Sequence, residues 1–309
     1  REHSPAAVKI KFINAGIGAT GSDLGTHRVQ KHLLKYQPDF VVIEYAVNDN
    51  GSPRAAETLE GLTRQILAMP NQPAVMLFFT MDNQGNNVQT EHMRIGNHYD
   101  LPMVSMRDAL WLELQAGRMQ WDDIEADTVH PNDKGHALCA EFIVSFLDSI
   151  WTTVPSVDDL PDTPPLPEPL ISDIYEHAAY YDAESITPAV GNGWAGKTNQ
   201  PFFNGWTAET PGSTLEFEVA GTTISLIFHY TNQKGGIASV QVDDLPPVKL
   251  EAYFSQDWGG GYSRFVQIAD HLPAGPHRLK ITLLEEKSEQ VDNHQFEVSA
   301  VLAAGITEK

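Results

Sequence analysis

The chain has 309 residues, of which 41% are hydrophobic and 20% are charged, and its formal net charge at pH 7 is −21. This length predicts two domains or one large domain, and the composition is typical of a globular protein. A nucleic-acid partner is not expected, because affinity for a phosphate backbone comes mainly from clustered Lys and Arg. A membrane partner is not expected either, since no stretch approaches the about 18 continuous apolar residues of a membrane span.

The only cysteine is Cys139, which excludes an internal disulfide and a four-thiolate zinc site. The histidines are scattered along the chain, and no H-E-x-x-H or comparable ligand spacing occurs. We therefore expect catalysis without a metal or another cofactor. The sequence indicates no localisation.

Residues 1–152 alternate strand-like and helical patterns. The expected strands cover 8–15, 39–47, 74–81 and 101–106, and the expected helices cover 23–36, 53–69, 88–98, 107–116 and 132–151. This alternation predicts an α/β domain with a flavodoxin-like parallel sheet and helices on both faces. The runs at 39–47 and 74–81 are apolar almost throughout, as expected of strands that are buried on both faces.

A proline-rich segment at 153–170 separates this domain from the rest and is typical of an extended, fairly stiff linker. In the following part, 171–309, the apolar period changes to two. For example, Leu215, Phe217 and Val219 alternate with acidic residues. This second domain is therefore expected to be an all-β sandwich of the jelly-roll type.

A glycine-rich loop, NAGIGATGSDLG at 14–25, follows the first expected strand. Glycines let a backbone approach a ligand closely and point its amides toward it. A phosphate site is one interpretation, but the spacing matches neither G-x-G-x-x-G nor a Walker loop.

A second feature, Asn48-Asp49, lies just past the run at 39–47. Open parallel sheets bind ligands at the carboxyl ends of their strands, where an asparagine can aim an amide donor at a developing oxyanion. An isolated Asn-Asp pair more often forms a turn or a helix cap. Alone, this pair therefore favours a structural role.

The third feature is ADTVHPNDKGH at 126–136, before the last expected helix. The spacing of Asp127 and His130 can let the carboxylate hold one imidazole nitrogen while the other nitrogen faces a nucleophile. The glycine loop, the Asn-Asp pair and this D-x-x-H-P motif occur in one order on one α/β scaffold. The combination resembles the SGNH (GDSL) hydrolase superfamily over about residues 8–150.

The resemblance implies a role for each of five residues. His130 would be the general base, and Asp127 would orient it. Asn48 would be the side-chain donor of the oxyanion hole, and Gly18 or Ala19 would supply the backbone donor. Fold and activity are implied as well: an α/β hydrolytic domain with a Ser-His-Asp triad.

One block of the family's pattern, the G-D-S block with the nucleophilic serine, is absent from the chain. We expect its strand upstream of Arg1, so that the parallel sheet lacks its first strand. Such a loss should expose apolar neighbours and unpaired backbone groups. Ser22, in GSDL, and Ser105, at the end of an expected strand, are poor candidates for the nucleophile.

Aromatic residues are frequent in the loops of the second domain, and flat aromatic faces suit the apolar faces of sugar rings. Trp258 and Tyr262, which flank three glycines, are the better candidates for sugar contacts, and Trp194 is a further one. About half of these aromatic side chains, Phe202 and Phe203 included, are instead expected in the sandwich core.

The order of the two domains resembles bacterial carbohydrate acetylesterases that carry a family-35-like carbohydrate-binding module. This resemblance implies that the module can cover the catalytic pocket. It also implies a structural Ca²⁺ in the β domain, for which Asp182 and Glu184 are candidate ligands.

We therefore expect a serine esterase that removes acetyl groups from polysaccharides or oligosaccharides, with an acetylated glycan as its partner. A homo-oligomer is compatible with the sequence. The same triad would also serve a lipase-like or thioesterase activity, which long apolar loops would favour, and none occurs. A chain without its nucleophile could instead be a non-catalytic carbohydrate-binding protein.

Overall fold

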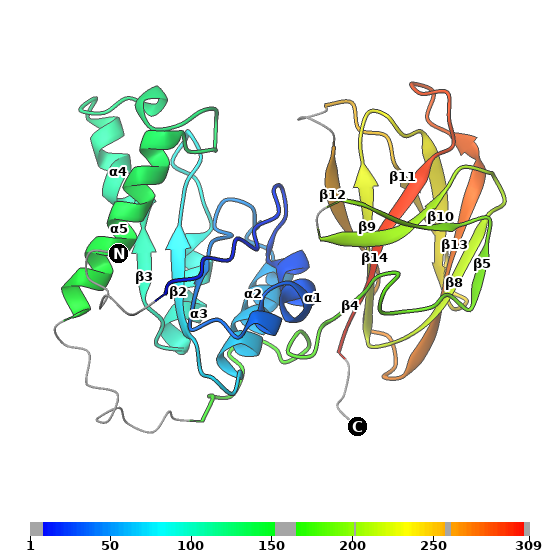
Figure 1. Cartoon of the computed structure of the whole chain (residues 1–309), viewed down its shortest axis with the longest axis horizontal. Coiled ribbons are helices and arrows are strands. Elements are labelled where there is room, and N and C mark those ends of the chain that lie inside the picture. Colours follow the sequence, from blue (N-terminus) through cyan, green and yellow to red (C-terminus); the bar gives the residue numbers. More distant parts are fainter. Residues whose placement is uncertain (1–8, 152–164, 201, 257–260, 306–309) are drawn as a thin grey trace.

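The structure, a computed structural model, describes residues 9–151, 165–200, 202–256 and 261–305. Figure 1 shows an α/β domain beside a β domain, with helices α1 and α2 between the parallel sheet and the β domain. The first domain contains α1 (Ser22–His32), the 3-10 helix η1 (Leu34–Tyr36), β1 (Phe40–Ile43), α2 (Pro53–Leu67), β2 (Ala74–Phe79), α3 (Gln89–His98), β3 (Met103–Ser105), α4 (Met106–Gln115), the 3-10 helix η2 (Trp121–Asp123) and α5 (Asp133–Trp151). The expected α/β fold is confirmed. No helix of the described residues is long and apolar enough to cross a membrane.

The parallel sheet has the strand order β1-β2-β3. One face packs against α2, where Leu59 and Ile66 join Ile43 in a buried cluster. On the other face, Phe78 packs with side chains of α4 and α5. Because all three strands run in one direction, the loops that follow them lie at one edge, to which the arrows of β2 and β3 point in Figure 1.

The strand expected at 8–15 is not formed. Residues 9–15, the described part of this segment, have no regular secondary structure, and Phe12 is 87% exposed. Within the described residues β1 pairs with β2 alone, and its Phe40 and Val42 are 40% and 41% exposed. The expectation that this run is buried on both faces is therefore wrong for β1. A strand needs a neighbour to pair its backbone and cover its side chains, and one edge of β1 has none here.

Helix α5 has an uncovered apolar surface as well. Gly135 is its only buried residue in the structure, whereas Val144 and Trp151 are 48% and 60% exposed. Apolar residues are thus exposed both on α5 and along β1. The first domain has a hydrophobic surface that its described residues do not cover.

The segment that leads into the β domain is bonded to helix α2. Residues 153–164 of the expected linker lie outside the described part of the chain. The end of the linker, 165–170, is described and is fixed by Glu60, whose side chain is completely buried. The Glu60 carboxylate accepts hydrogen bonds from the backbone N–H groups of residues 170–172 at 2.5 to 3.0 Å, and from the Tyr99 hydroxyl at 2.7 Å. These bonds hold the start of the β domain on the α/β domain.

The β domain is a sandwich of two antiparallel sheets. Its strands are β4 (Ala179–Tyr181), β5 (Val190–Asn192), β6 (Ala195–Gln200), β7 (Phe203–Ala208), β8 (Thr214–Ala220), β9 (Thr223–Tyr230), β10 (Gly236–Val242), β11 (Val248–Glu251), β12 (Tyr262–Ala269), β13 (Pro276–Lys287) and β14 (Phe296–Ala304). One sheet has the order β11-β10-β13-β8-β5, and the other has the order β12-β9-β14-β7-β6, with β4 paired to β14. Leu215, Phe217 and Val219 are at most 3% exposed, as their alternation predicts.

Helix α1 contacts both domains. Its Leu24 is completely buried in a cluster with Ile227 of β9 and Leu302 of β14. The Lys31 ammonium of α1 lies 2.5 Å from Asp182 of the β domain, which is 2% exposed. The two domains are therefore packed together along this helix.

Candidate active site

The glycine-rich loop leads into α1 and has a left-handed residue that is not glycine. Ala19 has a φ of +57°, a conformation that is costly for a residue with a Cβ. Gly18, next to it, is exposed, and a Cβ there would meet no neighbour. Gly21 is different, since a Cβ would lie 2.5 Å from Oδ1 of Asp49. The close approach of this carboxylate requires glycine at position 21.

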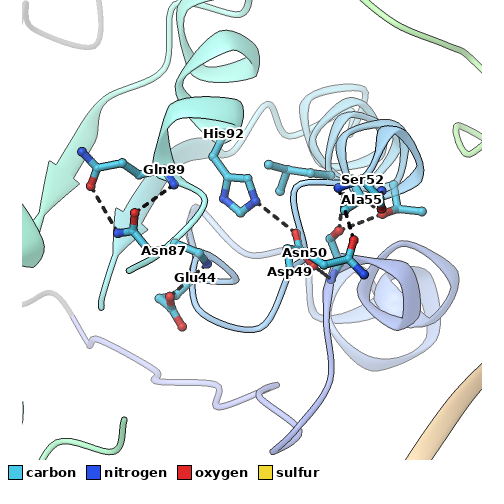
Figure 2. Close-up of polar contacts among 12 residues, drawn as sticks. Glu44, Asp49, Asn50, Ser52, Ala55, Asn87, Gln89 and His92 are labelled. Carbon is cyan, nitrogen blue, oxygen red and sulfur yellow. Dashed lines mark hydrogen bonds and ion pairs between the residues drawn. The ribbon is translucent and has the colours of Figure 1, made fainter. Parts of the chain in front are cut away.

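Asp49 joins three parts of the α/β domain. Its Oδ1 accepts a hydrogen bond from the backbone N–H of Ser22, at the start of α1, at 2.7 Å. Its Oδ2 lies 3.1 Å from Nε2 of His92 on α3, as Figure 2 shows. The carboxylate therefore ties the glycine loop to the loop after β1. Asp49 has a structural role, whereas its neighbour Asn48 is exposed.

The D-x-x-H motif forms an imidazole–carboxylate pair. His130 Nδ1 lies 2.8 Å from Oδ2 of Asp127, and the other oxygen of Asp127 accepts from the backbone N–H groups of Val129 at 2.8 Å and His130 at 2.9 Å. These bonds lower the pKa of Asp127 to about 2, and the bond to the His130 side chain has the largest effect. The carboxylate is thus ionised at neutral pH. The His130 side chain is 73% exposed, so its ring can be reached from solvent.

Asn132 fixes this motif to α5. Its Oδ1 accepts hydrogen bonds from the backbone N–H groups of Lys134 at 2.9 Å and Gly135 at 3.1 Å, which caps the helix. A Cβ on Gly135 would lie 2.0 Å from the Ile124 carbonyl oxygen. The first turn of α5 therefore packs directly on the loop that carries the pair.

A cavity of about 410 Å³ lies between the two domains. The α/β domain contributes Ala19 and Asn48 to its lining, and strand β12 contributes Tyr262 and Arg264. The structure thus brings together two expected oxyanion-hole residues and one expected sugar contact. His130 and Asp127 are not among the residues that line this cavity.

Arg54 links the two sides of the cavity. Its Nη1 donates to Oε1 of Gln267 on β12 at 2.6 Å, and its guanidinium lies 5.8 Å from the centre of the Phe265 ring. Burial, together with the charge of Asp49, raises the pKa of Asp23 in the same cavity, and Arg54 opposes this shift. Of the β12 residues that line the cavity only Tyr262 was predicted from the sequence, and Arg54 was not, because their juxtaposition arises only when the two domains pack.

Neither serine considered in the sequence is placed as a nucleophile. The completely buried Ser22 has its hydroxyl 2.7 Å from Oγ1 of Thr58. Ser105 accepts from the backbone N–H of Asp108 at 3.0 Å and so caps α4. In the described part of the chain, no serine hydroxyl forms a hydrogen bond with the His130 ring.

The expected sugar contacts have different outcomes. Trp194 is 9% exposed and belongs to the sandwich core, so its assignment as an exposed platform is wrong. The preceding Gly193, with a φ of +76°, makes the turn after which Trp194 enters the core. Trp258 lies outside the described residues. Of the aromatic residues expected in the core, Phe203 is buried and Phe202 is 38% exposed.

The candidate Ca²⁺ ligands Asp182 and Glu184 contact the ammonium group of a lysine. The Lys31 ammonium lies 2.5 Å from Asp182 and 3.1 Å from Glu184. The other carboxylate oxygen of Asp182 accepts from Ser185 Oγ at 3.0 Å. The two carboxylates therefore serve the contact between the domains, and this donor set does not favour Ca²⁺. Within the described ranges, no group of three His, Cys, Asp or Glu side chains could hold a metal ion.

The profile of the GDSL-like Lipase/Acylhydrolase family matches residues 3–138. Two solved structures of a two-domain esterase (CEX) active on acetylated mannans, one of them co-crystallized with mannopentaose, are 33% identical to the chain and match 96% of it. Their TM-scores are 0.86 and 0.87. The match covers 80% and 81% of those chains, so part of each has no counterpart here. No curated protein sequence matches the chain.

Proposed function

The chain belongs to the GDSL-like lipase/acylhydrolase family, and from this we propose that it is a serine esterase that removes acetyl groups from polysaccharides or oligosaccharides. The observation that carries the proposal is the distance of 2.8 Å between His130 Nδ1 and Asp127 Oδ2. A carboxylate that holds Nδ1 leaves Nε2 free to take a proton from a nucleophile. The similar two-domain esterase is active on acetylated mannans, which supports an acetylated glycan as the substrate.

In the proposed reaction, a serine hydroxyl attacks the acetyl carbonyl while His130 takes its proton. Asp127 stabilises the imidazolium that forms. The tetrahedral oxyanion accepts hydrogen bonds from the Asn48 amide and from the backbone N–H of Gly18 or Ala19. His130 then gives the proton to the departing sugar oxygen, and water cleaves the acetyl-enzyme by the same route.

We place the nucleophilic serine on a further strand beside β1, which precedes these 309 residues. The open edge of β1 and the exposure of Phe40 and Val42 support this placement. A parallel strand at that edge would end level with the loop after β1, where Asn48 lies. Its serine would then stand at the same edge of the sheet as the oxyanion donors.

The cavity between the domains is the proposed glycan site. Its volume of about 410 Å³ lies within the roughly 300 to 1,000 Å³ of small-molecule sites. Tyr262 offers an aromatic face, and Arg264, stacked 4.7 Å from the centre of the Tyr230 ring, offers N–H donors to sugar hydroxyls. Charged and amide groups in the lining favour a sugar over a long acyl chain.

Acetate release from acetylated manno-oligosaccharides tests the proposal. The chain should be assayed alone and in a form extended by the residues that its gene encodes before it. In the active form, His130→Ala should lose nearly all activity, and Asn48→Ala should lose about 100-fold or more. His136→Ala, which alters an exposed histidine on α5, is the matched control and should leave the rate unchanged.

Two outcomes would contradict this function. Near-normal turnover by His130→Ala would show that His130 is not the general base, and the assignment of the triad would fail with it. Glycan binding without hydrolysis by either form of the chain would favour the non-catalytic carbohydrate-binding protein.

A further inference from the structure

A third acidic residue, Glu125, lies in the same turn of the backbone as Asp127 and His130. Glu125 is 5% exposed, although the side chains of Asp127 and His130 in the same loop are 52% and 73% exposed. Its Oε2 is buried and has no hydrogen-bond partner. A buried carboxylate oxygen without a donor strongly disfavours the charged form.

The backbone holds Glu125 in this position. Glu125 forms an isolated antiparallel bridge with Pro131. On either side of the bridge, the backbone N–H of Ala126 donates to the His130 carbonyl at 2.8 Å, and the backbone N–H of Asn132 donates to the Ile124 carbonyl at 3.0 Å. The backbone of Glu125 is therefore held within the turn that carries Asp127 and His130.

The charges around Glu125 come from its own loop and from α5. Burial raises the pKa of Glu125 to about 7, the charge of Asp127 raises it further, and His130 opposes the shift. On α5, burial, together with the charge of Glu125, raises the pKa of the Cys139 thiol to about 11. Among the described residues, no Lys or Arg forms an ion pair with Glu125. Of Asp127, His130 and Cys139, only the His130 ring can carry a positive charge.

We propose that Glu125 is a positioning residue for the reaction, because the presence or absence of a proton on its carboxyl group changes how readily the His130 ring accepts one. The ionised carboxylate stabilises the imidazolium, and the neutral carboxyl does not. The proposal rests on the proposed function, because it treats His130 as the general base. The proposed coupling between Glu125 and His130 does not itself require that the chain hydrolyse an ester.

Titration of the His130 ring by NMR tests the coupling without any activity. In Glu125→Gln, the pH at which the ring takes up its proton should fall by about half a pH unit or more relative to the parent chain. Linkage requires that His130→Gln raise the titration midpoint of the Glu125 carboxyl by a similar amount. Glu141→Gln, which removes an exposed charge from α5, is the control and should shift neither group.

Folding of the variant is checked separately, and the parent chain supplies a measurement that needs no variant. The side chain of Gln resembles the neutral carboxyl, so Glu125→Gln should be at least as stable as the parent at pH 8. In the parent, the Glu125 carboxyl carbon should titrate near pH 7 and not near 4.5. An ordinary midpoint for this carbon, or an unchanged His130 titration in folded Glu125→Gln, would overturn the proposal.

In an active form, the acid limb of the pH profile of kcat/KM should move to lower pH in Glu125→Gln, with KM nearly unchanged. If no activity is found while the NMR shifts appear, the esterase assignment fails and the coupling stands. If activity is found and the acid limb does not move, the role of Glu125 fails and the esterase assignment stands.

Discussion

Acidification should weaken the packing of α1 on the β domain through His27. This side chain is 1% exposed, and its ring centroid lies 5.6 Å from that of Tyr175 and 6.1 Å from that of Phe265. Its Nδ1 lies 2.6 Å from the Asp23 carbonyl oxygen, while Nε2 is buried without a partner. Burial therefore lowers the pKa of His27 from 6.5 to about 4.

This shift sets the size and the sign of the effect. A fall from 6.5 to about 4, at about 1.4 kcal/mol per pH unit, amounts to about 3 kcal/mol of unfolding free energy. The unfolded chain takes up the proton first, because its histidine keeps the ordinary pKa. The contribution is therefore complete above pH 6.5 and is lost as the pH falls toward 4.

Urea unfolding at a series of pH values between 4 and 7 measures this loss when the parent chain is compared with His27→Asn. The asparagine amide can still donate to the Asp23 carbonyl, but it does not titrate. Stability of the parent should fall by about 3 kcal/mol more than that of the variant over this range. His136→Asn, at an exposed position, should behave like the parent. Parallel pH dependences for the parent and His27→Asn would refute the reasoning.

Two further substitutions test contacts between distant parts of the chain. Lys31→Met should lower the unfolding free energy by about 3 to 5 kcal/mol, because it leaves the buried carboxylate of Asp182 without its partner; urea unfolding measures this, and a loss no larger than that of exposed Lys35→Met would contradict it. Glu60→Gln should cost about 2 to 4 kcal/mol, because an amide NH₂ would face the backbone N–H groups of residues 170–172. Hydrogen exchange should show faster exchange of those amides, and unchanged protection would argue against the role of Glu60.

The elements that were predicted well are those whose signal is local. The spacing of Leu59, Leu62 and Ile66 predicts a helix, and α2 buries these three residues. The pair of Asp127 and His130 was predicted because three residues separate its members and one turn brings them together. Local geometry of this kind depends little on the rest of the chain.

The predictions that failed depend on contacts far along the chain. Residues 8–15 have a strand-like pattern, but the described residues provide no neighbouring strand for them to pair with. Ca²⁺ binding by Asp182 stays a prediction, but the sequence did not indicate its contact with Lys31, 151 residues away. Trp194, among glycines, matched an exposed loop aromatic, whereas the packing of two sheets buries it. No window of sequence contains these partners.

Helix α1 has consequences for engineering this enzyme. Its first residue, Ser22, is bonded to Asp49 beside Asn48, and its last turn holds Asp182 through Lys31. This one helix thus packs in the α/β domain and against the β sandwich at once. A graft of the sandwich onto another hydrolase would need a matching helical surface, and a chimera joined only at the proline-rich segment would leave Leu24 and His27 facing solvent. The unit that can be exchanged is the β domain together with α1.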